Sequence, residues 1–265
     1  MTGHITLLTD FGLGDGYVGA LKGVIAAIAP QAQVVDLAHD LPCGDVAHAA
    51  WVLRTAAPCW PAGTAHVAVV DPGVGTDRRA VALAVDDQVY FAPDNGLLSW
   101  VLRTAGTPKA IELTNAAFWR HPVSATFHGR DVFAPAAAYL VAGVPFSALG
   151  QPLDADTLVR LDLPADDPTS RRGVVVAIDR FGNAITSLCP VAVEGAATVV
   201  VTERAVPLRR AFAEAAPGEA LAYVGSSGRL EIGVNRGSAA EALGLRVGAP
   251  VAVGGACAAA VHESS

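Results

Sequence analysis

The chain has 265 residues, of which 52% are hydrophobic and 16% charged, and its formal net charge is −7 at pH 7. This composition supplies a sizeable core and excludes a largely disordered chain. The acidic balance, without a cluster of Lys and Arg, excludes nucleic acid and anionic membrane as expected main partners, because both reward a basic surface. We therefore expect a small-molecule ligand and one large or two modest domains.

The N-terminal part alternates β-rich runs with helical patterns, which indicates a layered α/β domain with a mostly parallel sheet. The pattern predicts strands over 4–8, 33–37 and 65–70, and helices over 18–29 and 45–57 that each end before a proline. It then predicts a hairpin of 81–85 and 89–92 and helices over 95–104 and 132–141. Asp71 directly follows the apolar strand 65–70, at the edge where open α/β sheets bind ligands.

The amino-acid composition becomes polar and rich in Asp and Pro between residues 151 and 172. We expect an N-terminal α/β domain over 1–165, a linker over 166–172 and a smaller C-terminal domain over 173–265. This last part contains short β-branched runs at 173–178, 197–202, 220–224, 230–234 and 250–253. With little helical periodicity between them, they predict an all-β barrel.

The cysteines form no C-x-x-C pair and have no His at zinc-finger spacing, so neither a disulfide framework nor a structural metal is predicted. They are Cys43, Cys59, Cys189 and Cys257. We expect free thiols in a reducing cytoplasm. Neither a secretory leader nor an apolar run of bilayer length is apparent, so export and membrane insertion are not expected.

The segment 14–19 (GDGYVG) matches the dinucleotide-binding pattern G-x-G-x-x-G, with Asp36 about where a ribose-binding acid would lie. Its first glycine comes six residues after the predicted strand, and Asp10 and Asp15 would repel a pyrophosphate. Asp10 could instead accept hydrogen bonds from a ribose diol, and Asp15 could face an ammonium group. A tight strand–helix turn with Asp caps also explains the segment.

Two further Gly-containing turns carry groups suited to handling water, at Asp71 with Arg78 or Arg79 and at His128. Each alone could be ordinary turn chemistry or surface charge. Together, an Asp, an Arg and a His could hold and deprotonate a water beside a cationic substrate, which predicts an enzyme. The remaining histidines considered are interpreted as structural, namely His39, His48, His66 and His121.

The C-terminal part has two turns, 179–183 (DRFGN) and 225–229 (GSSGR), that combine an aromatic ring, an amide and small hydroxyls. Such groups suit an adenine ring, which needs a stacking face and hydrogen bonds at its edge. Capped β-turns explain the same residues equally well.

Seven segments, taken in order, resemble the S-adenosyl-L-methionine (SAM) hydroxide adenosyltransferase family, which is related to the fluorinase and chlorinase enzymes. The resemblance runs from about residue 5 to residue 253 and implies an α/β domain, a β-barrel and a homotrimer with sites between subunits. The implied reaction converts SAM and water to adenosine and L-methionine without a cofactor. The segments are TDFG (9–12), DGYVG (15–19), VDPGVG (70–75) with Arg78 and Arg79, PDNGL (93–97), TFHGRD (126–131), Asp179 with FGN (181–183), and GSSG (225–228).

The resemblance also implies a role for individual residues. A water-binding triad falls on Asp71, Arg78 and His128, with Arg78 preferred to Arg79 by its offset from Asp71. Whether Asp71 or His128 takes the water proton stays open. The substrate-binding roles are Asp10 for the ribose diol, Asp15 and Asp179 for the methionine ammonium, Ser226 for its carboxylate, and Phe181 with Asn183 for adenine.

Departures from the halogenase branch favour hydrolysis. Those relatives resemble this chain but carry Tyr at Asp71, and the fluorinase carries a small polar residue at Val74, Ser at Gly129 and an extra loop. A carboxylate at residue 71 would repel a halide and attract a water proton. The alternatives are a chlorinase-like halogenase, a non-catalytic SAM or adenosine sensor, and an NAD-dependent oxidoreductase.

Overall fold

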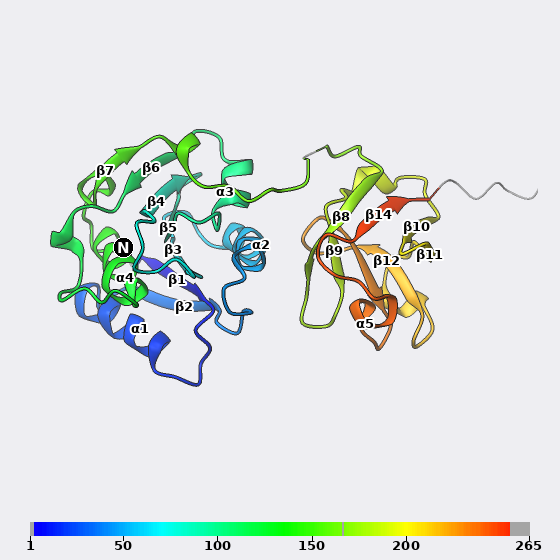
Figure 1. Ribbon diagram of the computed structural model, residues 1–265, viewed down its shortest axis with the longest axis horizontal. Coiled ribbons are helices and arrows are strands. Elements are labelled where there is room, and N and C mark those ends of the chain that lie inside the picture. The colour runs from blue at the N-terminus through cyan, green and yellow to red at the C-terminus, as the bar shows by residue number, and fades with distance from the viewer. Residues whose placement is uncertain (1–2, 166, 255–265) are drawn as a thin grey trace, which may run out of the picture. The chain divides into compact units, whose positions relative to one another are not determined.

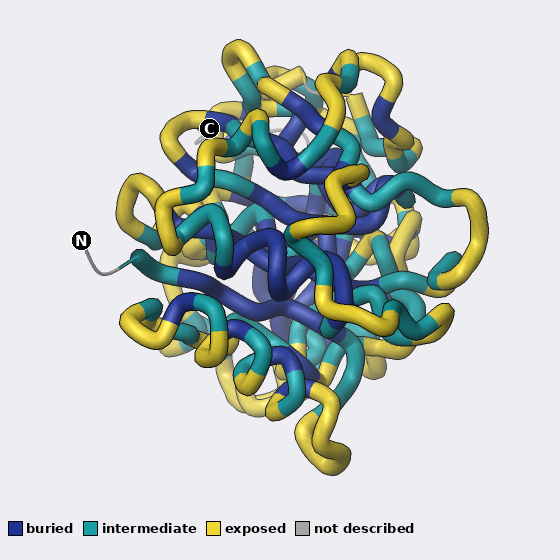
Figure 2. Tube along the Cα trace, turned by 90° about the vertical axis from the view of Figure 1, so that its left-hand side faces the viewer, coloured by how far each residue is buried: buried dark blue, intermediate teal, exposed yellow. Residues whose placement is uncertain are grey.

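The computed structural model describes residues 3–165 and 167–254. The chain divides after Asp162 into two compact units, an N-terminal α/β unit and a C-terminal β unit (Figure 1). The buried residues lie along strands and helices, and many of the exposed ones lie in connecting turns (Figure 2).

The N-terminal unit is built on a seven-stranded sheet with the order β2-β1-β3-β5-β4-β6-β7. Strands β2, β1, β3 and β5 pair in parallel, whereas β4, β6 and β7 continue the sheet through antiparallel pairs. Strand β6 therefore points the same way as the parallel set, which confirms the prediction of a mostly parallel sheet. The bounds are β1 His4–Thr9, β2 Gln33–Ala38, β3 Ala65–Val69, β4 Ala80–Val85, β5 Gln88–Pro93, β6 Lys109–Glu112 and β7 Gln151–Leu153.

Helices cover both faces of this sheet, α1 and α4 on one side and α2 and α3 on the other (Figure 1). Alternation along β1 sorts its side chains, because Ile5 and Leu7 pack in the first core and Leu8 in the second. Each such aliphatic side chain contributes about 1.5–3 kcal/mol when fully buried. The helices are α1 Tyr17–Ile28, α2 Val46–Ala56, α3 Ser99–Thr104 and α4 Ala134–Val141.

Two predicted helices are shorter than expected. The helix expected over 95–104 begins only at Ser99, because the chain first makes a turn in which Gly96 has φ +98°. The helix expected over 132–141 begins at Ala134 and continues a wider π-helical turn, Gly129–Phe133. The predicted hairpin is present, and Asp86 and Asp87 both have positive φ, as a two-residue hairpin turn requires.

The C-terminal unit is a seven-stranded antiparallel sheet with the order β11-β10-β14-β8-β9-β13-β12. A bridge between Leu208 and Ala222 brings the two edges together, so the sheet is nearly closed and the predicted barrel is confirmed. The short strands β9 and β11 and the short helix α5 (Ala239–Leu243) were not predicted. The strands are β8 Arg172–Ile178, β9 Ala184–Thr186, β10 Thr198–Val201, β11 Arg204–Pro207, β12 Ala220–Val224, β13 Leu230–Val234 and β14 Pro250–Val253.

The described cysteines, Cys43, Cys59 and Cys189, are free thiols, and Cys257 lies outside the described residues. Among residues 3–165 and 167–254, no helix is long and apolar enough to cross a membrane. The same part of the chain contains no group of three or more His, Cys, Asp or Glu side chains able to hold a metal ion.

Candidate active site

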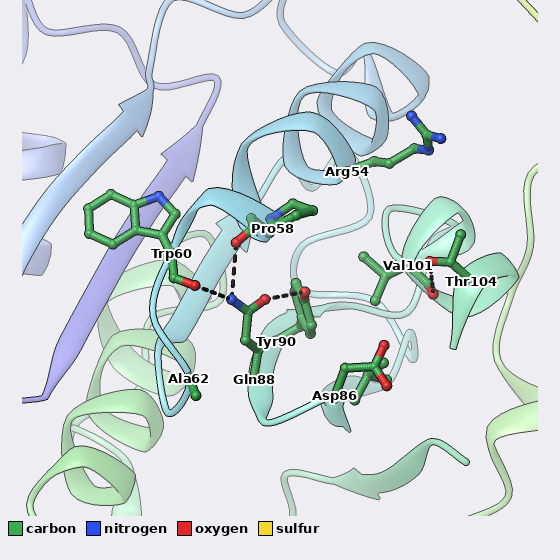
Figure 3. Close-up of a pocket in the computed structure, with 11 residues that line it drawn as sticks. Arg54, Pro58, Trp60, Ala62, Asp86, Gln88, Tyr90, Val101 and Thr104 are labelled. Atoms are coloured by element: carbon green, nitrogen blue, oxygen red, sulfur yellow. Dashed lines mark hydrogen bonds between the residues drawn. The ribbon is translucent and has the colours of Figure 1, made fainter. Parts of the chain in front are cut away.

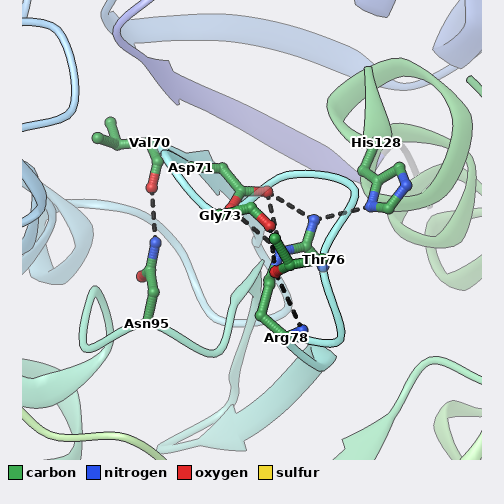
Figure 4. Close-up of polar contacts among 7 residues, drawn as sticks. All are labelled: Val70, Asp71, Gly73, Thr76, Arg78, Asn95 and His128. Atoms are coloured by element: carbon green, nitrogen blue, oxygen red, sulfur yellow. Dashed lines mark hydrogen bonds and ion pairs between the residues drawn. The ribbon is translucent and has the colours of Figure 1, made fainter. Parts of the chain in front are cut away.

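The turn after β3 places Asp71 at the carboxyl end of the parallel strands. The Asn95 side chain fixes this strand end, because its Nδ2 donates to the Val70 carbonyl at 2.8 Å (Figure 4). Gly75 closes the turn with φ +79°, and a Cβ there would overlap the Ala125 carbonyl oxygen. Only glycine therefore fits, and the turn packs directly against the segment that leads to His128.

Arg78 holds the Asp71 carboxylate from one side. Its Nε lies 3.0 Å from each carboxylate oxygen, and its Nη2 lies 2.5 Å from Oδ2. The two side chains are only 10% and 5% exposed, so this ion pair is largely shielded from solvent. Behind it, the guanidinium carbon lies 5.4 Å from the centre of the Phe133 ring. Charge pairing and packing together fix the orientation of the carboxylate.

The same guanidinium also reaches His128, with 2.8 Å between Arg78 Nη2 and His128 Nδ1 (Figure 4). Arginine only donates hydrogen bonds, so Nδ1 must accept and the imidazole proton must be on Nε2. Burial lowers the pKa of His128, and the positive charge of Arg78 lowers it further, against the opposing effects of Asp71 and Asp131. His128 is therefore neutral at neutral pH and offers an Nε2–H donor.

The adjacent Arg79 has different partners. Its Nε donates to Asp94 at 2.8 Å and its Nη2 donates to the Thr157 carbonyl at 2.6 Å. Asp94 in turn accepts from the Val159 amide at 2.8 Å. Arg79 thus ties the segment that follows β7 to the end of β5, and the structure brings only Arg78 of the two arginines to Asp71.

A cavity of about 140 Å³ opens beside this ion pair and is lined by Asp10, Asp71 and His128. The Asp10 Oδ2 accepts from the Gly44 amide at 2.8 Å, which leaves acceptor capacity on the same carboxylate. Asp15 is exposed on the turn before α1 and does not line this cavity. The other lining residues are mostly apolar, namely Phe11, Cys43, Gly44, Val69, Pro72, Val74, Thr126, Phe127 and Gly129.

In the C-terminal unit, Phe181 and Asn183 line a separate hollow of about 360 Å³ together with Phe212 and Arg236. Phe181 is 75% exposed, whereas Asn183 is buried. Asp179 organises this turn, because its Oδ1 accepts from the amides of Phe181 and Asn183 and its Oδ2 accepts from Asn183 Nδ2. No sequence pattern had indicated Phe212 or Arg236, which lie far from the turn in sequence.

Ser226 is exposed on the turn between β12 and β13 and does not line that hollow. The next residue, Ser227, donates to Glu231 Oε1 at 3.3 Å, and Tyr223 donates to Glu231 Oε2 at 2.8 Å. A buried carboxylate therefore supports the turn that presents Ser226.

The N-terminal unit has a further hollow of about 280 Å³ near the β4–β5 turn (Figure 3). Its polar wall is internally paired: Gln88 donates to the carbonyls of Ala57 and Trp60 and accepts from the Tyr90 hydroxyl. None of the predicted site residues lines it. The strand-end cavity with Asp10, Asp71 and His128 is therefore the candidate active site.

Comparison with known proteins identifies a family. Residues 5–150 match the SAM hydroxide adenosyltransferase N-terminal domain, and residues 173–252 match the C-terminal domain of the same family. The (R)-S-adenosyl-L-methionine hydrolase of Thermus thermophilus is 49% identical, with 93% of this chain and 98% of that protein covered.

A crystal structure of a conserved hypothetical protein from the same organism has a TM-score of 0.81 and 45% identity, covering 96% of this chain and 100% of that one. The fluorinase of an Actinoplanes species is a more distant relative, 28% identical with 94% of this chain and 96% of that protein covered. Both domain matches and the 49% identical relative place the whole chain in one family. The chain belongs to the SAM hydroxide adenosyltransferase family.

Proposed function

We propose that the chain hydrolyses SAM, with water attacking the ribose C5' and the methionine sulfur leaving to give adenosine and L-methionine. The observation that carries this proposal is the shielded Asp71–Arg78 ion pair with a neutral His128 at the rim of one cavity. Relatives named as hydrolases of this substrate, up to 49% identical, support it.

In the proposed mechanism, Asp71 accepts the water proton. The lone pair of His128 Nδ1 already faces Arg78, so His128 can only donate its Nε2–H to the water oxygen and orient it. Bulk water is a very weak acid, with a pKa far above neutral pH, so the proton leaves as the C–O bond forms, a contribution of about 100- to 10,000-fold. The departing sulfonium becomes a neutral thioether and needs no proton.

The remaining roles concern substrate binding. Asp10 would hold the ribose diol, which its free acceptor capacity supports. In the C-terminal unit, the exposed Phe181 ring and the buried Asn183 amide suit adenine. Asp15 and Asp179 would bind the ammonium of methionine. Ser226, which is exposed on its turn, would bind the carboxylate through its hydroxyl.

Assembly and location are further parts of the proposal. The homotrimer that the sequence resemblance implies, with two subunits completing each site, is part of this proposal, and light scattering of the purified protein tests it. The free thiols at Cys43, Cys59 and Cys189 support a reducing, cytoplasmic location.

Hydrolysis is preferred to halogenation because of Asp71, and the packing around Gly129 bears on the fluorinase branch, which carries Ser there. A Cβ at this position would lie 3.3 Å from Cζ of Phe11, whose ring packs edge-on against Tyr17 and Phe127. A side chain at residue 129 therefore requires the Phe11 ring to move by a few tenths of an ångström. The carboxylate of Asp71 also makes the cavity unfavourable for a halide ion.

The configuration of the substrate is a separate point. Three relatives that are 42–49% identical to this chain are named for the (R) form of SAM. We extend this preference to the chain, and incubation with a mixture of both sulfonium epimers, followed by chromatography, tests it. Equal consumption of the two epimers would contradict the preference without affecting hydrolysis itself.

The central experiment is incubation of the purified chain with SAM, with and without chloride or fluoride, followed by chromatography. We expect adenosine and methionine under all conditions, and loss of activity by about 1,000-fold in Asp71→Asn. A halogenated nucleoside would favour the halogenase alternative. Binding of SAM without adenosine release would favour the sensor, and undiminished hydrolysis by Asp71→Asn would remove the role of this carboxylate.

A further inference from the structure

We propose that His39 is a positioning residue that fixes the turn after β1 so that Asp10 meets the ribose diol. His39 takes no part in the proposed mechanism, and the sequence alone predicts a structural role for it. The inference rests on the proposed function, in which Asp10 binds the diol. It adds a residue outside the cavity that decides how well the enzyme selects a substrate with a diol.

The His39 side chain is buried and contacts Thr9, the last residue of β1. The exposed fraction of His39 is 4% and that of Thr9 is 0%. His39 Nδ1 lies 2.7 Å from Thr9 Oγ1, which also accepts from the Phe11 amide at 3.2 Å. A three-part chain of contacts therefore runs from the imidazole through one hydroxyl to the backbone that follows Asp10.

The contact made by the other ring nitrogen of His39 determines which atom donates in the hydrogen bond between Nδ1 and the Thr9 hydroxyl. Nε2 lies 3.1 Å from Asp36 Oδ1, and Lys22 Nζ donates to Asp36 Oδ2 at 2.7 Å. Partial burial raises the pKa of Asp36, but contacts with Lys22 and His39 outweigh this and lower it. Asp36 is therefore ionised, Nε2 carries the proton that faces it, and Nδ1 accepts the hydrogen of the Thr9 hydroxyl.

The backbone of His39 holds the same turn at a second point. Its carbonyl accepts from the Gly12 amide at 2.8 Å, where Gly12 has φ +66°. The loop that begins at His39 then supplies the Gly44 amide, which donates to Asp10 Oδ2 at 2.8 Å. Asp10 thus lies in a turn that residue 39 holds on both sides.

This arrangement predicts an effect on diol recognition that a loss of stability would not produce. Adenosine and 2',3'-dideoxyadenosine differ only by the diol, and neither is consumed in the proposed reaction. A hydrogen-bonded pair of hydroxyls on a carboxylate should make the wild-type chain bind adenosine about 10- to 100-fold more tightly. Calorimetric titration of the full chain measures this ratio directly.

Three substitutions test the role of His39. His39→Leu keeps an apolar body and removes both polar contacts, so we expect the affinity ratio to fall by about tenfold. Thr9→Val keeps the shape of the buried residue without its hydroxyl and should lower the ratio similarly. His39→Asn places an amide oxygen near the position of Nδ1 and should restore most of the ratio.

The chain offers a matched control in His66. This histidine lies on β3, is fully buried and contacts Thr6, with 2.7 Å between its Nδ1 and Thr6 Oγ1. Thr6 precedes Thr9 by three residues on β1. His66→Leu should lower thermal stability, as His39→Leu does, yet leave the affinity ratio at the wild-type value. The control separates a local role at Asp10 from general loosening of the sheet.

Two outcomes would overturn the inference, and they differ in what else they affect. A wild-type ratio retained by His39→Leu and Thr9→Val would overturn the role of His39 and leave the proposed function intact. Equal binding of the two nucleosides by the wild-type chain would remove the diol role of Asp10 and, with it, the inference. If His39→Leu does not fold, Thr9→Val and His39→Asn still decide between these outcomes.

Discussion

The two units of the chain present their candidate residues in opposite ways. In the N-terminal unit, Asp71, Arg78 and His128 hold one another, and the ion pair is at most 10% exposed. In the C-terminal unit, Phe181 is 75% exposed and Ser226 stands on the surface of its turn. The groups proposed for chemistry are therefore fixed before any ligand arrives, as efficient electrostatic catalysis requires.

The C-terminal unit fixes backbone rather than side chains. Asp179 holds the turn of Phe181 through two amide hydrogen bonds, and Glu231 supports the turn of Ser226 through Ser227. The side chains that face solvent retain their freedom. Substitutions at Asp71, Arg78 and His128 should therefore alter rate, whereas those at Phe181 and Ser226 should alter affinity.

The largest expected effect would come from removing the guanidinium that joins the N-terminal groups. Arg78→Met leaves a shielded carboxylate without its partner and frees His128, so we expect kcat to fall by about 1,000-fold, or about 4 kcal/mol. The matched variant Arg79→Met should change kcat less than about threefold and lower Tm, because Arg79 ties Asp94 to the segment at Thr157. Equal losses of kcat in both variants would contradict the assignment.

The second effect concerns acid stability and belongs to the N-terminal unit, since no histidine occurs in the described part of the other unit. Burial lowers the pKa of His66 from 6.5 to about 4. The unfolded chain thus gains a proton below about pH 6.5 that the folded chain refuses until about pH 4. The contribution of His66 to the free energy of unfolding is fully present above pH 6.5. About 3 kcal/mol of stability is lost as the pH falls to about 4.

Urea unfolding at a series of pH values tests this, with His66→Leu as the comparison. The variant should lose most of the slope between pH 6.5 and 4. An unchanged slope would show that other groups cause the acid sensitivity.

The third effect concerns the exposed residues of the C-terminal unit. Phe181→Ala and Ser226→Ala should each weaken SAM binding by about tenfold, from a lost stacking face and a lost hydrogen bond. Because both residues are exposed, Tm should stay within experimental error. Titration in the Asp71→Asn background measures affinity without turnover, and kcat should change less than about threefold. A large fall in kcat at unchanged affinity would contradict the proposal that these two residues contribute to substrate affinity and not to the rate.

The smallest effect is in the pH dependence of kcat. Burial and then Arg78 lower the pKa of His128, so the neutral form persists below pH 6.5. We expect kcat to vary less than about twofold between pH 8 and 6.5 and to fall only at lower pH, when a proton on Nδ1 would face Arg78. His128→Gln should remove this fall of kcat at low pH. A fall of kcat with its midpoint above pH 6.5 in the wild-type chain would contradict a lowered pKa for His128.

Much of the fold could be predicted because local patterns were strong. The apolar run 65–70 and the proline-limited helices identified the layered unit, and the position of Asp71 followed from the strand end. The three-residue strands β7 and β9 carry too few residues for any periodicity. The start of α3 at Ser99 depends on the turn at Gly96, which propensity alone did not reveal.

The site was predictable in its residue types but not in its contacts. Sequence spacing left Arg78 and Arg79 as alternatives, and only the folded chain separates their partners. The proton position on His128 also depends on a contact between residues 50 positions apart. Asn95 lies in the segment PDNGL that carried the resemblance, but its contact with Val70 could not be read from that segment. Phe212 and His39 lie in none of those segments, so no local motif indicated their roles.

The contact between Gly129 and Phe11 has a consequence for how such a site can evolve. A Cβ at residue 129 would lie 3.3 Å from Cζ of Phe11, so that ring must move by a few tenths of an ångström to admit it. The effect of Gly129→Ser is therefore expected to depend on the residue at position 11, which is an epistatic coupling. A library that varies residues 11, 71 and 129 together would measure this coupling, which single substitutions cannot.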